Sequence, residues 1–482
     1  MENSVYRYLY MILVVLVFPS CIGKQEQIVG KVDDRIISLE EFRTFYELDP
    51  NFGIDSSGSG ALSGELNKYI DQILAYTRAD EMDLLKDSVF IKGRDWEMRQ
   101  AMLRELYRQQ VQYQITVDDK DLRAEFLKGT IQVHVRQLFT RELDQAERWY
   151  IQLTQGDSFQ TLAREAFQDT VLAENGGDLG WVPLNSLDED FGNVILTLQQ
   201  NEITKPVHTP WGYHIIQLLD RRDQVIISET DFEHQRPSLE KKIRQRKGRQ
   251  LASQYISNFI GKYNPQPDPS TFRFLWQHTV PDGQQENKIL SLSVELNDER
   301  IHHIQQNYGA YLDKPLVNYK NGTFTLGEYL HRVAQMPYGN RPRFKTVEQL
   351  SNQLGSWVRD ELLFREAKKR NLDREQRVMA DVHSIMEQQF YNMFVEQEIS
   401  ALFIPDSVLH YFKLPIRGRA GKNQDLSHFH NLEEWRWVEA EKNMHRKLRH
   451  QDISIWIDQD MLQQESRSIH WDQRIRMIMV RR

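Results

Sequence analysis

The residues Gly176 to Trp181 read Gly-Gly-Asp-Leu-Gly-Trp, and they form the first group whose types and spacing suggest chemistry. Two consecutive glycines allow backbone angles that other residues avoid, so they predict a tight, shaped loop. A glycine-rich loop can cradle a phosphate when a lysine and a Ser or Thr follow at fixed spacing. Neither that pattern nor a dinucleotide fingerprint is present here. We therefore interpret the loop as a shaped turn rather than a phosphate site.

Histidines near the C-terminus form a second group, because imidazoles are common metal ligands. His428 and His430 are two residues apart, and His445 and His450 follow them. Two such histidines on one strand can chelate a metal, but no carboxylate or cysteine completes a convincing set of ligands. We interpret these side chains as surface histidines, and we expect neither a metal ion nor a cofactor.

The segments around the glycine loop have the apolar patterns of helices and strands. Apolar residues recur at helical spacing from Phe159 to Phe167 upstream and from Leu187 to Leu198 downstream. The run from Gly212 to Leu219 is apolar and rich in β-formers, which predicts a strand. Another strand is predicted from Val133 to Phe139. Together these segments predict a small α+β domain around the glycine loop.

This stretch resembles the parvulin family of peptidyl-prolyl isomerases over residues 130 to 222. The resemblance rests on several motifs in one order, which are the opening strand, a helix, Gly156-Asp-Ser-Phe159, Gly176-Gly-Asp-Leu-Gly180, Pro206-Val207 and Gly212-Tyr-His-Ile-Ile216. It implies a small antiparallel sheet packed by helices. It also implies an isomerase that acts on X-Pro bonds without a covalent step.

The resemblance further implies which residues form the site. The proline ring would lie in an apolar pocket, made here by Leu179, Leu187 and Phe191. The family's polar set, two histidines with an Asp or Cys and a hydroxyl group, maps onto His214, Gln137, Thr170 and Thr209. Gln137 stands where the family has its first histidine, and Thr170 stands at the Asp or Cys position. These two departures put the efficiency of catalysis in doubt, more than the fold.

The composition limits the classes of partner. The chain has 482 residues, enough for about two to four domains, and a net charge of −8. Acidic and basic residues are well mixed, and no basic block stands out as a footprint for phosphates. We therefore expect no nucleic-acid partner.

The N-terminus has the pattern of a secretory signal. An apolar run from Tyr8 to Phe18 follows Arg7 and is too short to span a bilayer comfortably. A small residue, Ser20, directly precedes Cys21, the only cysteine of the chain. This order resembles a bacterial lipoprotein signal, in which the thiol is acylated. The alternative is an ordinary signal peptide or an uncleaved anchor with an incidental cysteine.

Helical segments lie on both sides of the parvulin-like block, and they share a pattern. Ser38-Leu-Glu-Glu41 and Thr325-Leu-Gly-Glu328 both read as capping boxes that follow a strand and a turn. Similar helix patterns follow each box, which predicts a degenerate internal repeat. The alternative is that any two capped helical segments look alike.

We therefore expect an α+β multidomain protein in which mostly helical chaperone modules flank one parvulin domain. The expected ranges are 1–21 for a lipoprotein-type signal peptide, 22–128 for an N-terminal helical module, 129–222 for the parvulin-type domain, 223–269 for a helix and Pro-rich linker, 270–413 for a second helical module that repeats the first, and 414–482 for a C-terminal tail of uncertain structure.

This arrangement resembles the SurA and PrsA class of envelope foldases. The resemblance implies a peptidyl-prolyl isomerase and chaperone, anchored to the membrane by a lipid and facing the periplasm or the cell exterior. Its partners would be unfolded or newly exported proteins that contain X-Pro bonds. Two alternatives are a non-catalytic holdase and a subunit of an envelope assembly, each of which would use the parvulin fold for binding only.

Overall fold

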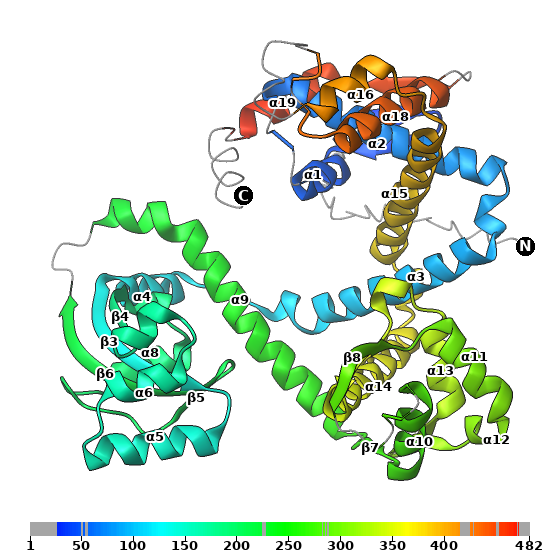
Figure 1. The fold of residues 1–482 in the computed structure, drawn as a ribbon. Coiled ribbons are helices and arrows are strands. Elements are labelled where there is room, and N and C mark those ends of the chain that lie inside the picture. Colours follow the sequence, from blue (N-terminus) through cyan, green and yellow to red (C-terminus); the bar gives the residue numbers. More distant parts are fainter. Residues whose placement is uncertain are drawn as a thin grey trace, which may run out of the picture. The chain divides into compact units, whose positions relative to one another are not determined.

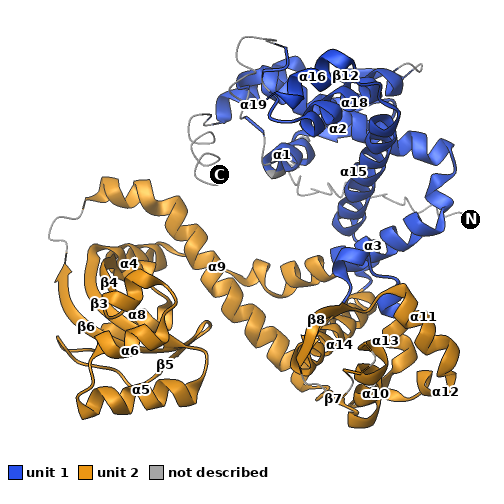
Figure 2. Cartoon of the chain, viewed as in Figure 1, with its two compact units in different colours: residues 1–102, 331–342, 371–482 blue, residues 103–330, 343–370 orange. Residues whose placement is uncertain are grey.

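The computed structural model describes residues 27–49, 52–53, 56–223, 228–281, 283–284, 286, 289–414, 425–427, 429–449, 453–469 and 471. The chain divides into two compact units (Figure 2). Unit 1 takes residues 1–102, 331–342 and 371–482, and unit 2 takes residues 103–330 and 343–370. The expected signal peptide, with Cys21, lies outside the described residues. No helix in the described part of the chain combines the length and the apolar character needed to cross a membrane.

A small sheet in unit 1 joins a segment near the start of the described residues to one near their end. The strands β1 (Ile28–Val32) and β2 (Arg35–Ser38) form a hairpin, and Asp33 takes a φ of 49° in its turn. The strand β12 (Ile455–Ile457) pairs antiparallel with the other edge of β1. The sheet order is therefore β12-β1-β2.

Long helices make up the rest of unit 1. They are α1 (Leu39–Leu48), α2 (Gly58–Glu81), α3 (Ser88–Gln110, which continues into unit 2), α15 (Gln376–Ala401), α16 (Asp406–Lys413), α18 (Leu432–Leu448) and α19 (Gln459–Ser468). The helix α2 packs against α1, α15, α18 and α19. Its buried residues include Leu62, Leu66 and Ile70, which lie at helical spacing.

The C-terminal tail, whose structure the sequence left uncertain, thus supplies α18, β12 and α19 to unit 1. A carboxylate fastens α19 to the N-terminal helix α1. The Arg43 guanidinium donates two hydrogen bonds to Glu465, at 2.7 and 2.6 Å, and the Tyr46 hydroxyl donates a third. Glu465 is buried, so these donors replace the water that its charge would otherwise require.

Unit 2 contains an antiparallel sheet with the strand order β4-β3-β6-β5 (Figure 1). Its strands are β3 (Ile131–Thr140), β4 (Asp178–Pro183), β5 (Val207–Thr209) and β6 (Gly212–Asp223). Its helices are α5 (Leu143–Gln155), α6 (Phe159–Ala166), α7 (Thr170–Glu174) and α8 (Glu189–Ile195), with the 3₁₀ turn η3 (Leu184–Ser186) before α8. The structure thus confirms the expected small antiparallel sheet packed by helices.

Both faces of this sheet are covered, because side chains alternate along each strand. On one face, Leu138 and Ile215 pack with Trp149 of α5 and Phe159 of α6. On the other face, Val133, Val135, Ile216 and Leu218 pack with Phe191 and Ile195 of α8 and with Leu184 of η3. The neighbours Ile215 and Ile216 therefore belong to opposite layers, as a strand requires.

Two helices flank this sheet domain in the sequence and pack against each other. They are α4 (Asp119–Thr130) and α9 (Glu229–Gly261). Phe126 of α4 and Phe232, Leu239 and Ile243 of α9 share one apolar cluster. The helix expected after residue 223 is therefore packed along one face against α4.

The rest of unit 2 consists of short strands and helices. These are β7 (Gln266–Pro267), α10 (Pro269–Thr279), β8 (Ile289–Glu295), α11 (Asp298–Asn307), α12 (Gly309–Leu312), β9 (Pro315–Tyr319), β10 (Gly322–Thr325), α13 (Leu326–Ala334, which continues into unit 1), β11 (Arg343–Thr346) and α14 (Val347–Lys369). The Pro-rich segment expected to act as a linker lies within unit 2, and its strand β7 pairs with β9.

The two helical segments share an order of elements. In each, a hairpin leads into a capped helix and a longer helix follows, although α10 to α12 precede the hairpin in the second segment. A left-handed residue lies two positions after the end of each longer helix, Asp83 after α2 and Asn371 after α14. Thr325 forms both halves of its capping box with Glu328. Ser38 accepts the Glu41 amide, but the Glu41 carboxylate bonds Arg35 and Tyr69 instead of reaching back. Repetition of one module remains our proposal for this likeness.

Candidate active site

Three polar side chains meet on one face of the four-stranded sheet. His214 lies on β6, and its Nε2 atom is 2.9 Å from the Thr209 hydroxyl on β5. Its Nδ1 atom is 2.7 Å from the side-chain oxygen of Gln137 on β3. The register explains the second contact, because Phe139 is paired with His214 and Gln137 lies two residues away on the same face.

These contacts define a chain of hydrogen bonds. The side-chain oxygen of Gln137 can only accept, so Nδ1 carries the imidazole proton in this orientation of the amide. The Nε2 atom is then the acceptor, and the Thr209 hydroxyl donates to it. Thr209 in turn accepts the backbone N–H of Trp211, at 3.2 Å. One tautomer of a neutral imidazole satisfies every one of these contacts.

Aromatic rings enclose the imidazole and exclude water from it. The Phe139 ring centroid lies 4.9 Å from that of His214, and the Phe191 centroid lies 5.3 Å away with the two rings nearly perpendicular. Only 8% of His214 is exposed. Burial lowers the pKa of His214 to about 4, although the nearby negative charge of Asp188 acts in the opposite direction. The imidazole is therefore neutral at physiological pH.

We expect this burial to appear in the pH dependence of stability. The folded chain holds His214 neutral, whereas an unfolded chain has a histidine pKa near 6.5. The unfolded chain therefore binds an extra proton between about pH 4 and 6.5, so the free energy of unfolding falls as the pH falls through this window. Urea unfolding at pH 7 and pH 5 should show a smaller loss for His214→Gln than for wild type. The exposed His208, changed to glutamine, is the control, and equal losses in all three proteins would contradict this account.

An apolar wall lies beside the imidazole. Phe191 of α8 is almost fully buried, and Leu179 and Leu187 pack against the same cluster while remaining partly exposed. The structure thus brings together the three residues that the resemblance assigned to the proline pocket. It also brings His214, Gln137 and Thr209 into direct contact.

The glycine loop positions Gln137 on its strand. The Gln137 amide donates to the carbonyl of Gly177, at 2.9 Å. Gly177 has a φ of +75°, and a Cβ atom added to it would lie 2.0 Å from the Gln137 carbonyl oxygen. Only glycine can therefore let the loop approach β3 this closely. Gly177 therefore acts through the backbone, by letting the loop lie close to β3.

Thr170, the remaining candidate, is placed differently. It is exposed at the first residue of α7, and no described hydrogen bond joins it to His214, Gln137 or Thr209.

The sequence analysis missed two residues that affect the site, Phe139 and Asp188. Strand pairing between the Val133–Phe139 and Gly212–Leu219 segments could have indicated Phe139. Asp188 carries no such signal, because it serves as the N-cap of α8 and accepts the Asp190 amide.

Two of the C-terminal histidines have carboxylate neighbours. The Nδ1 atom of His430 lies 3.1 Å from Glu434, and that of His445 lies 2.7 Å from Asp71. His428 and His450 lie outside the described residues. Within the described ranges, the His, Cys, Asp and Glu side chains form no group of three or more that could hold a metal ion.

Comparison with known proteins places one family domain in this chain. Residues 140–220 match the rotamase family of PPIC-type PPIASE domains. Foldase protein PrsA 1 of Bacillus cereus is 25% identical over 175 residues, which cover 36% of this chain and 58% of that protein. Chaperone SurA of Pseudomonas syringae pv. tomato is 40% identical over 77 residues, which cover 16% of this chain and 18% of that protein.

Among solved structures, a crystal structure of a PpiC-type peptidyl-prolyl cis-trans isomerase domain is 28% identical to this chain. The match covers 20% of this chain and 96% of the chain in that structure, and its TM-score is 0.19. The chain spans less than two thirds of the length of these curated relatives. The family match includes Thr209, His214 and the three residues of the apolar wall. It begins at residue 140, so Gln137 and the start of β3 lie just before it.

Proposed function

We propose that this chain, which carries a parvulin-type rotamase domain, is a peptidyl-prolyl cis-trans isomerase and chaperone for newly exported proteins. One observation carries the isomerase part. A buried, neutral His214 is held between Gln137 and Thr209 beside the apolar wall of Leu179, Leu187 and Phe191. The family match and the relatives named as foldases and chaperones support the same proposal.

This geometry suits a reaction in which no proton moves and no covalent bond forms. Rotation about an X-Pro bond breaks the amide resonance, at a barrier of about 18–20 kcal/mol. The twisted amide has less charge separation than either planar form, so an apolar site favours it. The wall would bind the proline ring, and the His214 chain would fix the floor of the site. A glutamine at position 137 is sufficient for this role, because its side-chain oxygen needs only to accept a hydrogen bond from Nδ1–H of His214.

Phe191→Ala is expected to lower kcat/KM for a proline-containing peptide at least tenfold. The ring packs nearly perpendicular to the His214 imidazole, and truncation of a buried phenylalanine typically costs about 3–5 kcal/mol, with less lost in an open pocket. A proline-isomerisation assay on the full chain measures this effect. Phe403→Ala is the control, because Phe403 is 82% exposed and lies in unit 1. Equal activity of the two variants would contradict the assignment of the proline site.

The same proline-isomerisation assay shows whether glutamine at position 137 lowers the turnover. The resemblance expects histidine at this position, so Gln137→His is expected to raise turnover if glutamine weakens the site. Far-UV circular dichroism must first show that the variants fold equally. If wild type and Gln137→His both fail to exceed the uncatalysed rate, the non-catalytic holdase becomes the better account.

We also propose a lipid anchor at Cys21, with the chain held at the membrane of the cell envelope. The support is the short apolar run and the single cysteine that follows Ser20. Mass spectrometry of the mature protein is expected to show an acylated Cys21 at the N-terminus. The Cys21→Ser protein should leave the membrane fraction. A free thiol at Cys21, or a mature terminus elsewhere, would refute this proposal.

A further inference from the structure

Unit 2 contains a pocket of about 430 Å³ that shares Leu187 with the proposed proline site. One wall comes from η3 and α8 of the sheet domain, and the other comes from α4 and α9, which flank that domain in the sequence. A pocket of this size lies within the range that holds small ligands or protruding side chains. The parvulin-like block by itself supplies only the first wall.

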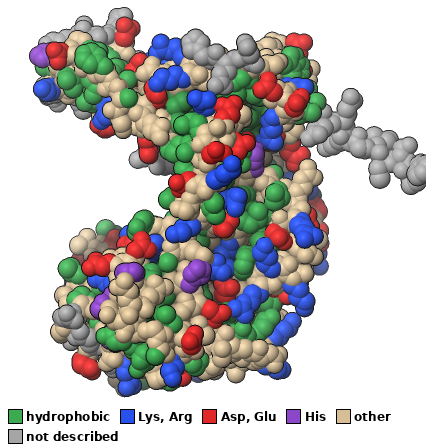
Figure 3. Space-filling model, turned by 90° about the vertical axis from the view of Figure 1, so that its right-hand side faces the viewer, with side chains coloured by type: hydrophobic (Ala, Val, Ile, Leu, Met, Phe, Trp, Pro, Cys, Tyr) green, Lys and Arg blue, Asp and Glu red, His purple; other side chains and the backbone are tan. Residues whose placement is uncertain are grey.

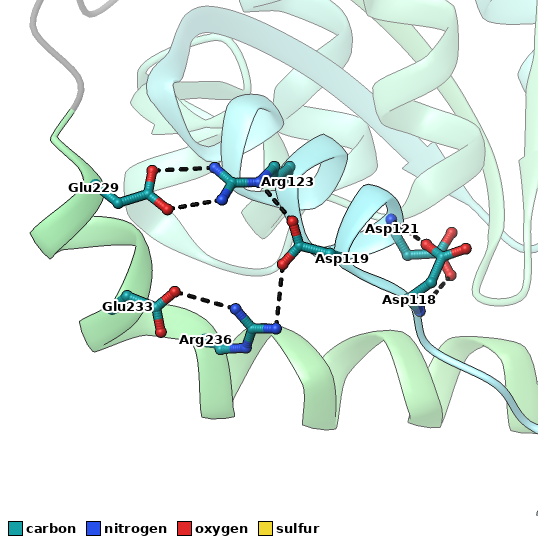
Figure 4. Close-up of polar contacts among 7 residues, drawn as sticks. All are labelled: Asp118, Asp119, Asp121, Arg123, Glu229, Glu233 and Arg236. Atoms are coloured by element: carbon teal, nitrogen blue, oxygen red, sulfur yellow. Dashed lines mark hydrogen bonds and ion pairs between the residues drawn. The ribbon is translucent and has the colours of Figure 1, made fainter.

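Ion pairs hold α9 against α4 near the start of both helices. Arg123 of α4 donates to Asp119, at 2.6 Å, and to Glu229 of α9, at 2.7 Å (Figure 4). Arg236 of α9 reaches back to Asp119 of α4, at 3.1 Å. Each arginine thus bridges the two helices, and both arginines contact Asp119. These contacts are exposed, so each contributes little alone, but together they fix the register of the two helices.

A buried carboxylate continues this connection at the pocket itself. Glu125 of α4 is 2% exposed and contacts Lys242 at 2.8 Å and Arg246 at 2.7 Å, both from α9. Burial acts to raise the pKa of Glu125, but hydrogen bonds from these two cations outweigh it and hold the pKa below its usual value. Lys242 also donates to the carbonyl of Asn185 in η3. The second wall is therefore tied to the sheet domain.

The lining of the pocket combines apolar and charged side chains. Its apolar residues are Leu184, Leu187, Leu196 and Pro210, and Leu196 is 38% exposed. The charged lining residues are of both signs, so the pocket favours neither an anion nor a cation strongly. On the face drawn in Figure 3, acidic and basic side chains are likewise interspersed among hydrophobic ones. The occupant best suited to this pocket is an uncharged apolar side chain.

The pocket adjoins the proline site. Leu187 belongs both to the apolar wall beside His214 and to the lining of this pocket. Pro210 lines the pocket and directly follows Thr209, which bonds His214. A polypeptide whose proline lay against the apolar wall would therefore have neighbouring residues within reach of the pocket.

We propose that this pocket is a second subsite, which binds an apolar side chain of the client segment whose proline occupies the isomerase site. The proposal rests on the proposed function and names the preferred substrate class, extended chains with a large aliphatic residue near the proline. It also gives α4 and α9 a role in recognition, since they form half of the subsite.

The test compares two fluorescent dodecapeptides with a central Ala-Pro, one with leucines on both sides and one with serines in their place. Fluorescence anisotropy with the full chain is expected to show about tenfold tighter binding of the leucine peptide, which corresponds to about 1.4 kcal/mol. Leu196→Asp should remove this difference, because it places a charge among the apolar residues of the lining. Asn193→Trp should remove it too, because Asn193 is an exposed lining residue and a tryptophan there would fill the pocket.

Ile151→Asp is the matched control, because Ile151 is 51% exposed on α5 and does not line the pocket. This variant should keep the tenfold difference. The inference is overturned if wild type binds the two peptides equally, or if Leu196→Asp and Asn193→Trp both keep the difference. Binding does not depend on turnover. A chain without isomerase activity that still distinguishes the peptides would refute the isomerase and leave the subsite standing.

Discussion

Gly177→Ala is expected to destabilise the sheet domain by several kcal/mol and to abolish the site at His214. Two effects combine in this variant. An alanine at a φ of +75° costs roughly 1–2 kcal/mol, because its Cβ crowds its own backbone. The added Cβ would also lie 2.0 Å from the Gln137 carbonyl oxygen, so β3 and the loop must separate. The loss of their 2.9 Å hydrogen bond would release Gln137 from His214.

Gly180→Ala is the matched control for this prediction. Gly180 lies three residues further along, in β4, and has a similar φ of +67°, but an added Cβ would meet nothing within 4 Å. Its replacement should therefore cost only the backbone strain and leave the isomerase assay nearly unchanged. Urea unfolding of both variants measures the difference. Equal losses of stability would show that backbone strain alone, and not the close approach to β3, makes Gly177 necessary.

Deleting residues 432–482 is expected to unfold unit 1 and to leave the four-stranded sheet of unit 2 folded. The deletion removes β12 from its pairing with β1, and it removes α18 and α19 from the surface of α2. It also strips three buried or partly buried carboxylate contacts, those of Glu465 with Arg43 and of Asp71 with His445 and Arg449. We expect the loss of this pairing, packing and ion-pair energy to exceed the free energy of unfolding of a typical domain, which is roughly 5–15 kcal/mol.

Amide hydrogen exchange measures this outcome. Residues 28–81 should lose their protection, whereas residues 131–223 should keep theirs. Point variants give a graded version of the experiment. Leu462→Ala in α19 should cost about 2–5 kcal/mol, because Leu462 is fully buried, and the exposed Gln463→Ala should be nearly neutral. Full protection of residues 28–81 in the deleted chain would mean that the C-terminal segment is not part of the core of unit 1.

The sequence by itself determined the features that depend on residues close to one another along the chain. Ser38 and Thr325 cap their helices because each side chain reaches an amide three residues away. The turns at Asp33 and Asn321 need residues that tolerate a positive φ, and both residue types do so. Thr209 and His214 lie five residues apart across a tight hairpin. Such contacts involve short loops and few competing partners.

The site was predicted in part, for a related reason. The ordered motifs of the parvulin-like block pointed to His214, Thr209 and the apolar wall as candidates. They also aligned Gln137, which lies 77 residues before His214, with a position of the family's polar set. The hydrogen bond between Gln137 and His214 then follows from the register of β3 and β6. The exposed position of Thr170 and the influence of Asp188 depend on how α7 and α8 lie against the sheet. No pattern in a single sequence records these orientations.

Only the tertiary structure decided which distant segments share a core. The pairing of β12 with β1, the place of α15 in unit 1 and the pairing of β7 with β9 all join segments that carry no mutual signal. The physical reason is that burial is not directional. Any amphipathic helix can cover any apolar face, so the choice among many similar helices depends on the packing of the whole unit. The pocket between α8 and α9 exists for the same reason, because its two walls meet only after both helices have packed.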